Sequence, residues 1–157
     1  MKTQLILVGK TDSKIFSEAI DIYVGRLKHY ITFEPVVIPD IKNTKKLTEE
    51  QQKKLEGDCI LKLIQPGDTV VLLDEAGKEM RSVEFAEWMR RKMNATSRKL
   101  IFVIGGPYGF SKEVYERADE KISLSKMTFS HQMVRLIFVE QLYRAMTILN
   151  GEPYHHE

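Results

Sequence analysis

The chain has little of several features that would define its class at once. Only one of its 157 residues is cysteine, which excludes an internal disulfide framework and a zinc site built from several cysteines. That residue, Cys59, falls in an apolar stretch, so we expect a buried, inert thiol. No apolar run is long enough to span a membrane, and the N-terminal run is too short for a signal peptide. We therefore expect a reduced, soluble, cytoplasmic protein without a membrane partner.

Net charge is also low. The formal charge is +2 although 29% of the residues are charged, and a protein that holds nucleic acid by electrostatics alone usually has a larger positive excess. Either the chain has no nucleic-acid partner, or oligomerisation doubles a modest basic patch. The residues available for such a patch, most of which would otherwise be solvated helix faces, are Lys42, Lys45, Lys46, Arg90, Arg91, Lys92, Arg98 and Lys99.

Apolar runs alternate with helical patterns along the whole chain. We predict strands at Gln4–Val8, Val36–Ile38, Thr69–Leu73, Leu100–Ile104 and Ile122–Leu124. Three-and-four spacing of apolar residues predicts five helices between them. The first follows the caps that Thr11-Asp12-Ser13 offers and reaches Leu27, and the second covers 44–64 with Leu47, Leu55, Ile60 and Leu63 inward. The third is capped by Ser82, a short fourth is capped by Ser111, and a long fifth runs from about Gln132 to Asn150. This alternation predicts a single α/β domain over 1–157, with a mostly parallel sheet flanked by helices on both faces.

Ligands of open parallel sheets bind beyond the carboxyl ends of the strands. That rule selects the loops after Leu73 (DEAGKEM), after Ile104 (GGPYGFS) and after Leu124 (SKMTFSHQ), which we expect to converge. The glycine loop has neither the dinucleotide fingerprint nor the P-loop spelling. It is either a tight turn or a loop whose backbone contacts an adenine. The stretch Ser123–His131 combines main-chain donors with apolar walls, which suits an adenosyl ligand.

The last helix and the tail contain the remaining candidates. Glu140 and Arg144 are spaced to form an ion pair, which is either a surface pair or one that directs Arg144 towards a phosphate or a partner subunit. His131 at the helix start reads as a cap or surface residue. Composition alone predicts that the tail from Glu152 onwards is frayed. Its two adjacent histidines lack a third ligand in a suitable frame, so we expect no metal site.

Five motifs, in this order and spacing, carry a resemblance that covers the whole chain: LLDEAGK, IGGPYGFS, SLSKMTFSHQMVR, EQLYRA and PYH. Together they resemble the bacterial ribosomal RNA large subunit methyltransferase H family, which belongs to the SPOUT class. The resemblance implies a fold with a C-terminal trefoil knot, S-adenosylmethionine as methyl donor and a homodimer. It also implies methylation of N3 of a pseudouridine in a hairpin of 23S rRNA, on the assembled ribosome.

The resemblance also implies roles for particular residues. The catalytic, substrate-side residues would be Arg144, Tyr154 and His155, with His155 as candidate base, Arg144 stabilising the ring anion or holding a phosphate, and Tyr154 stacking on the base. The tail would reach the cofactor pocket of the partner subunit. The chain departs from the family's usual spelling at Tyr108, at Ser130 and Gln132 around His131, and at His156. The cofactor-binding residues would be Leu73, Gly105, Leu124, Ser125, Lys126, Met127, Thr128 and Phe129.

Two other classes also fit the α/β pattern. A nucleotide-dependent oxidoreductase would have parallel βα units and a glycine loop, but only Val8-Gly9-Lys10 stands where its fingerprint belongs after the first strand. A non-catalytic RNA- or ribosome-binding factor is the second alternative. Binding of S-adenosylmethionine, of a nicotinamide cofactor, or of neither distinguishes the three.

Overall fold

The computed structural model describes residues 1–96 and 98–156. Its sheet contains five parallel strands in the order β2-β1-β4-β3-β5. In chain order they are β1 (Lys2–Val8), β2 (Thr32–Ile38), β3 (Thr69–Glu79), β4 (Lys99–Ile104) and β5 (Glu120–Ser123). The predicted parallel α/β architecture is therefore confirmed for the described residues.

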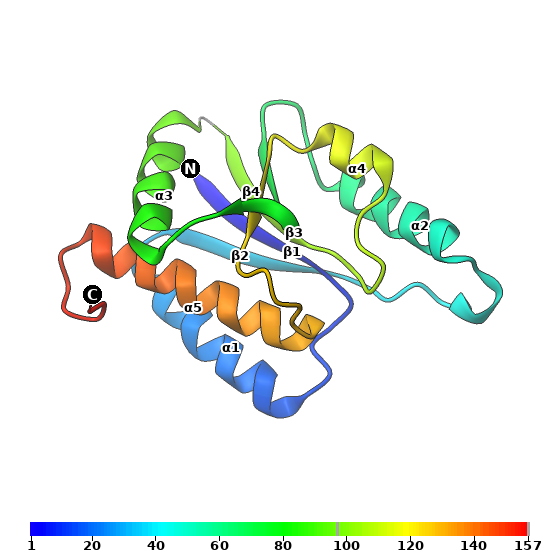
Figure 1. Cartoon of the computed structure of the whole chain (residues 1–157), viewed down its shortest axis with the longest axis horizontal. Helices are drawn as coiled ribbons and strands as arrows, with labels where there is room; N and C mark the ends of the chain where they lie inside the picture. The colour runs from blue at the N-terminus through cyan, green and yellow to red at the C-terminus, as the bar shows by residue number, and fades with distance from the viewer. Residues whose placement is uncertain (97, 157) are drawn as a thin grey trace.

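Helices cover both faces of the sheet (Figure 1). On one face α5 (His131–Leu149) packs between α1 (Lys14–Leu27) and α3 (Ser82–Ala95). On the other face α2 (Glu49–Lys62) lies beside α4 (Lys112–Arg117). No helix in the described part of the chain is long and apolar enough to cross a membrane.

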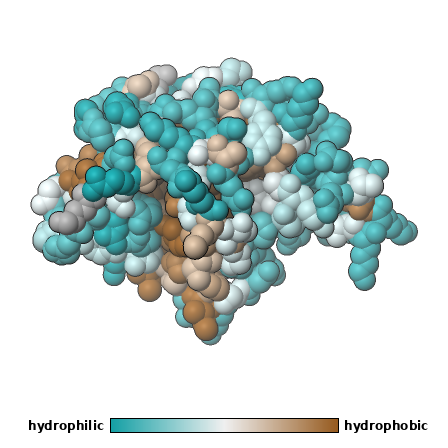
Figure 2. All heavy atoms as spheres, viewed as in Figure 1, coloured by the Kyte–Doolittle hydropathy of each residue, from teal (hydrophilic) through white to brown (hydrophobic). Residues whose placement is uncertain are grey.

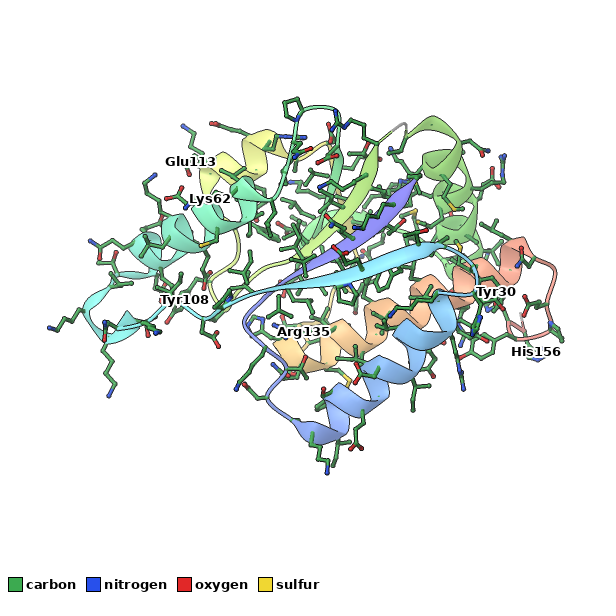
Figure 3. All side chains as sticks on the ribbon, turned by 180° about the vertical axis from the view of Figure 1, so that it is seen from behind. Tyr30, Lys62, Tyr108, Glu113, Arg135 and His156 are labelled. Carbon is green, nitrogen blue, oxygen red and sulfur yellow. The ribbon has the colours of Figure 1, made fainter. Side chains whose placement is uncertain are left out.

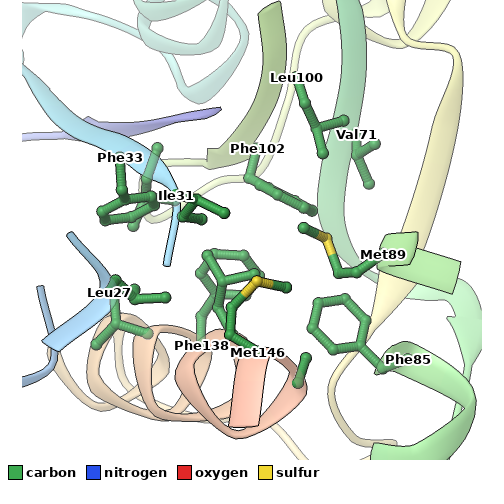
Figure 4. Close-up of a cluster of buried hydrophobic side chains, with 14 of the residues drawn as sticks. Leu27, Ile31, Phe33, Val71, Phe85, Met89, Leu100, Phe102, Phe138 and Met146 are labelled. Atoms are coloured by element: carbon green, nitrogen blue, oxygen red, sulfur yellow. The ribbon is translucent and has the colours of Figure 1, made fainter. Parts of the chain in front are cut away.

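The continuous apolar strands are explained by burial on both sides of the sheet. Along β4, Phe102 belongs to the core beneath α1, α3 and α5, whereas its neighbours Ile101 and Val103 belong to the smaller core beneath α2 and α4. Figure 4 shows the larger core, in which Phe102 and Phe138 of α5 lie with ring centroids 4.8 Å apart. Because both residues are fully buried, this contact joins α5 to the middle of the sheet.

The single helix predicted over 44–64 is wrong. A short 3₁₀ helix (Thr44–Lys46) is followed by a break, and α2 begins after Thr48, whose hydroxyl accepts a hydrogen bond from the Gln51 backbone in a capping box. Leu55 is 41% exposed rather than inward, because the buried face of α2 carries Glu56 and Gly57. Cys59 is half-buried against the smaller core rather than fully buried.

Other boundaries shift by identifiable causes. β2 extends back past Pro35, which an edge strand tolerates because its outer backbone needs no partner. β3 continues beyond Leu73, so most of the predicted loop after it is strand. Ser82 is the first residue of α3 rather than its cap, and its hydroxyl donates to Gln141 of α5 at 2.7 Å. The cap Ser111 is confirmed, and of the three residues offered as caps of α1 it is Ser13 that caps it.

Apolar side chains also gather on one outer face. Figure 2 shows them at the lower edge of the molecule, where Figure 1 places α1 and α5. Ile15 and Ile22 of α1 are 78% and 54% exposed, and Met133 of α5 is 37% exposed. Between the two helices lies a groove whose lining includes Ala19 and Ile137.

Candidate functional site

A cavity of about 370 Å³ lies beyond the carboxyl ends of β3, β4 and β5. The three loops selected from the sequence converge there, as expected for neighbouring parallel strands. All the predicted cofactor-binding residues except Lys126 line the cavity: Leu73, Gly105, Leu124, Ser125, Met127, Thr128 and Phe129. The side chain of Lys126 is instead 87% exposed, with its ammonium 3.8 Å from Glu79.

The shape of the cavity begins with an irregularity in β3. Its pairing with β5 shifts register between Leu73 and Lys78, and the intervening residues bulge towards the cavity. Gly77 lies directly against β5: a Cβ atom at that position would be 2.6 Å from backbone atoms of Ile122. Since backbone cannot move aside as a side chain can, the glycine of the DEAGK motif is sterically required.

The glycine loop closes a second wall. Gly109 has a φ of +84° and donates its backbone N–H to Gly106 O at 3.2 Å, which forms a tight turn. Behind the turn lies the carboxyl group of Glu56, which is only 4% exposed and accepts a hydrogen bond from Gln52 at 3.2 Å. Burial raises the pKa of this carboxyl group. Glu56 was missed from the sequence, although its position four residues before the inward Ile60 places it on the same helix face.

Hydroxyl groups hold the third wall together. Ser125 accepts a hydrogen bond from Met127 N at 2.9 Å, and Ser123 donates to the backbone carbonyl of Ser125 at 2.9 Å. Ser130 caps α5 by accepting from Met133 N. These contacts confirm an ordered loop between β5 and α5, with apolar walls and backbone groups at the cavity.

Polar side chains that sequence reasoning did not assign also line the cavity. Asp74 and Glu75 lie in β3 directly after Leu73. Tyr115 of α4 donates its hydroxyl hydrogen to Asp74. Burial and this carboxylate raise the pKa of Tyr115 to about 12. His131, expected as a cap or surface residue, is exposed at the start of α5 and lines the cavity as well, and partial burial together with the nearby Arg135 lowers its pKa. From the sequence, the loops containing Asp74, Glu75 and His131 were expected to converge, but these side chains had no predicted role at the cavity and Tyr115 was not selected.

A second polar cluster lies at the other end of α5. Arg144 donates to Glu140 Oε1 at 2.6 Å, and the hydroxyl of Tyr154 donates to the same oxygen at 3.0 Å. The guanidinium of Arg144 lies 4.8 Å from the centre of the Tyr154 ring, and its Nη1 lies 3.1 Å from Nδ1 of His155. The three predicted catalytic residues are therefore brought together. Glu140 holds two of them: the sequence predicted its ion pair with Arg144 but not its hydrogen bond with Tyr154.

The tail is not frayed, contrary to what composition predicted. Glu152 accepts a hydrogen bond from the hydroxyl of Tyr30 at 2.8 Å, and its backbone N–H donates to Thr147 O at 2.9 Å. Burial, and then hydrogen bonds with Tyr23 and Glu140, raise the pKa of Tyr154 well above its usual value. The raised pKa favours the neutral phenol, which donates its hydroxyl hydrogen to Glu140.

The cavity and the second cluster lie at opposite ends of α5. Figure 3 shows Arg135 near the start of this helix and His156 beyond its end. His131 lines the cavity and Arg144 follows it in the same helix, which separates them by about 20 Å at 1.5 Å per residue. Within one chain, the residues of the second cluster do not face the cavity.

In the part of the chain that the structure describes, three of the basic residues considered for a nucleic-acid patch form ion pairs, and one of these pairs joins Arg90 to Glu87. Lys99 and Lys92 pair with Asp68 and Glu120. Lys42, Lys45 and Lys46, by contrast, are exposed around the 3₁₀ helix. Among the described residues, no group of three or more His, Cys, Asp or Glu side chains is arranged to hold a metal ion.

Comparison with known proteins supplies independent evidence. Residues 1–155 match the family model described as "Predicted SPOUT methyltransferase". Proteins named ribosomal RNA large subunit methyltransferase H are similar over the full length of both chains. The identity is 66% for the protein of Bacteroides fragilis, 64% for that of Parabacteroides distasonis and 57% for that of Porphyromonas gingivalis.

Proposed function

Because the chain belongs to the SPOUT methyltransferases, within the ribosomal RNA large subunit methyltransferase H family, we propose that it methylates N3 of a pseudouridine in 23S rRNA. The methyl donor is S-adenosylmethionine, and the substrate is the assembled ribosome in the cytoplasm. The observation that carries the proposal is the cavity itself, formed by the residues that the family motifs assign to the cofactor, Lys126 excepted. Membership in this family removes the oxidoreductase and non-catalytic alternatives.

The donor set of the cavity fits an adenosyl ligand. Glycine-loop backbone can approach an adenine closely, and Leu124 and Phe129 provide apolar walls. When bound there, the cofactor supplies an electrophilic methyl group on a sulfonium. We also assign the family's trefoil knot to the region around α5. One observation supports it: α5 follows the edge strand β5 yet packs between α1 and α3, on the face opposite α4.

The separation of the two clusters supports a homodimer. In a two-fold symmetric dimer, the same surface of each protomer forms the interface. The exposed apolar face of α1 and α5 is the surface that suits this contact. If the two copies of α5 run antiparallel, the end that carries Arg144 lies beside the start of the partner's α5, where the partner's cavity opens. The active site is then composite, with the cofactor on one protomer and Arg144, Tyr154 and His155 on the other.

The hydrogen bonds of the second cluster restrict the roles of its residues. Arginine only donates hydrogen bonds, so Nδ1 of His155 accepts from Arg144, and the proton of the neutral ring is on Nε2. His155 acts as the base for the N3 proton only if substrate binding releases Nδ1 from Arg144. Arg144, held by Glu140, is placed to stabilise the negative charge that develops on the uracil ring. Tyr154 stacks on the base or orients it.

The experiment that tests this function is mass spectrometry of 23S rRNA from cells with and without the protein. We expect loss of one methyl group on one pseudouridine, restored when purified protein and S-adenosylmethionine are added to ribosomes from the deletion strain. Identical methylation of 23S rRNA in both strains, together with no incorporation in vitro, would refute the proposal.

A further inference from the structure

The charged side chains that line the cavity are of one sign. Asp74 and Glu75 are carboxylates, and no lysine or arginine of the described residues contributes to the lining. The cavity lining also includes His131, and the lowered pKa of this residue favours the neutral imidazole. The cavity is therefore anionic at neutral pH.

Both carboxylates are held in place by groups from other segments of the chain. Glu75 accepts a hydrogen bond at 2.9 Å from the hydroxyl of Thr128, which lies in the loop before α5. Asp74 accepts from the hydroxyl of Tyr115 in α4 and from the backbone N–H of Ala76 at 2.8 Å. These hydrogen bonds hold the two carboxylates at the cavity.

The nearby cations are directed elsewhere. Lys126 extends into solvent and pairs with Glu79. Lys121 lies over the ring of Tyr115, 5.5 Å from its centre. Arg135 is buried and donates to the backbone carbonyl of Val8 at 2.8 Å and to Thr11 at 3.2 Å. None of the three is among the residues that line the cavity.

We propose that Asp74 and Glu75 make the cavity select its occupant by charge, so that the cationic methyl donor binds more tightly than the uncharged-sulfur product. The inference rests on the proposed function, since it requires a donor in this cavity. In the transfer, N3 gives up its proton to His155 or to water and forms the new bond to the methyl carbon with its electron pair. The bond from sulfur to that carbon breaks, and its electron pair stays on sulfur. The ligand therefore loses one positive charge, and with it the attraction of both carboxylates, so that release of the product is favoured.

The expected size follows from the exposure of the two groups. A charge pair at an exposed or partly exposed site changes affinity by up to about fivefold, well below the effect of a buried pair. The effect should shrink as salt rises, because screening shortens the range of the interaction.

The test is calorimetric binding to the full-length protein at about 50 mM and about 500 mM salt. The ligands are S-adenosylmethionine, S-adenosylhomocysteine, and sinefungin, which has an ammonium-bearing carbon in place of the sulfonium. The variants are Asp74→Asn and Glu75→Gln, which keep size and remove charge. Glu79→Gln is the matched control, because Glu79 ends the same strand without lining the cavity.

We expect each variant to weaken both cationic ligands by about twofold to fivefold at low salt and S-adenosylhomocysteine by less than about 1.5-fold, with no change in the control. An equal loss for all three ligands would overturn the inference, since the carboxylates would then contact the shared adenosyl portion. Unchanged affinities would overturn it too, and both outcomes leave the proposed function intact. If none of the ligands binds the unmodified protein, the cofactor assignment itself fails and this inference with it.

Discussion

Two inactive variants of this chain should restore activity when they share a dimer. The reasoning starts from α5, along which Arg144 lies about 20 Å from His131 at the cavity. Methyl transfer needs reacting atoms about 3–3.5 Å apart, and no arginine side chain bridges the remaining gap. If Arg144 takes part in methyl transfer, as we propose, it serves the cavity of the partner subunit.

The perturbation uses one substitution in each half of the composite site. Arg144→Ala removes the cation, and Ser125→Trp fills the cavity, which Ser125 lines. Each variant alone is inactive at both sites of its homodimer. In a mixed dimer, one of the two sites combines an intact cavity with an intact tail. Random exchange makes half of the dimers mixed, so about a quarter of the unmodified activity returns.

The assay measures incorporation of labelled methyl groups into ribosomes from the deletion strain, after the two variants are unfolded and refolded together. Native mass spectrometry confirms that mixed dimers form, and calorimetry confirms that Arg144→Ala still binds S-adenosylmethionine. If mixed dimers form and the mixture is no more active than its separate components, the composite site is wrong.

Three further predictions concern the frame around the site. Gly77→Ala should destabilise the protein by about 2–3 kcal/mol and abolish cofactor binding, because its Cβ would lie 2.6 Å from the backbone of Ile122 and separate β3 from β5; urea denaturation and calorimetry that match the unmodified protein would contradict this. Phe138→Ala, at a fully buried position, should lower the free energy of unfolding by about 3–5 kcal/mol, and a loss below about 1 kcal/mol would mean that α5 is not packed on the sheet as described. Glu56→Gln should flatten the pH dependence of stability: burial raises the pKa of the Glu56 carboxyl group in the folded state, so its contribution is greatest at acid pH and is lost as pH rises above the ordinary glutamate range. Chemical denaturation from pH 4 to 8 measures it, and parallel profiles for the two proteins would refute the assignment.

The strands were predictable because their burial is of the simplest kind. A parallel sheet covered by helices on both faces needs apolar side chains at every position, which is how residues 100–104 read in the sequence. α5 was predictable to within one residue because Ser130 caps it and Gly151 follows it.

The prediction of a single helix over 44–64 is wrong for a physical reason. Its few apolar residues fit more than one helical face, and Leu55 was assigned inward although Glu56 occupies the buried face. The break at Thr48 was readable, since threonine followed three residues later by glutamine is a capping box. The burial of Glu56 could not be predicted from the sequence, because it depends on which segments of the fold pack against this side chain.

By itself, the sequence determined the family, the parallel α/β class and which three loops form the cavity, because these depend on motif spelling and on strands ending at one edge of a sheet. Only the tertiary structure decided which side chains share a site. It placed Asp74 and Glu75 at the cavity and turned Lys126 away from it, and it gathered Tyr154 and Arg144 on one oxygen of Glu140. It also put the cavity and this second cluster at opposite ends of α5. These outcomes depend on spatial distances between residues far apart in the chain, and local sequence patterns do not give those distances.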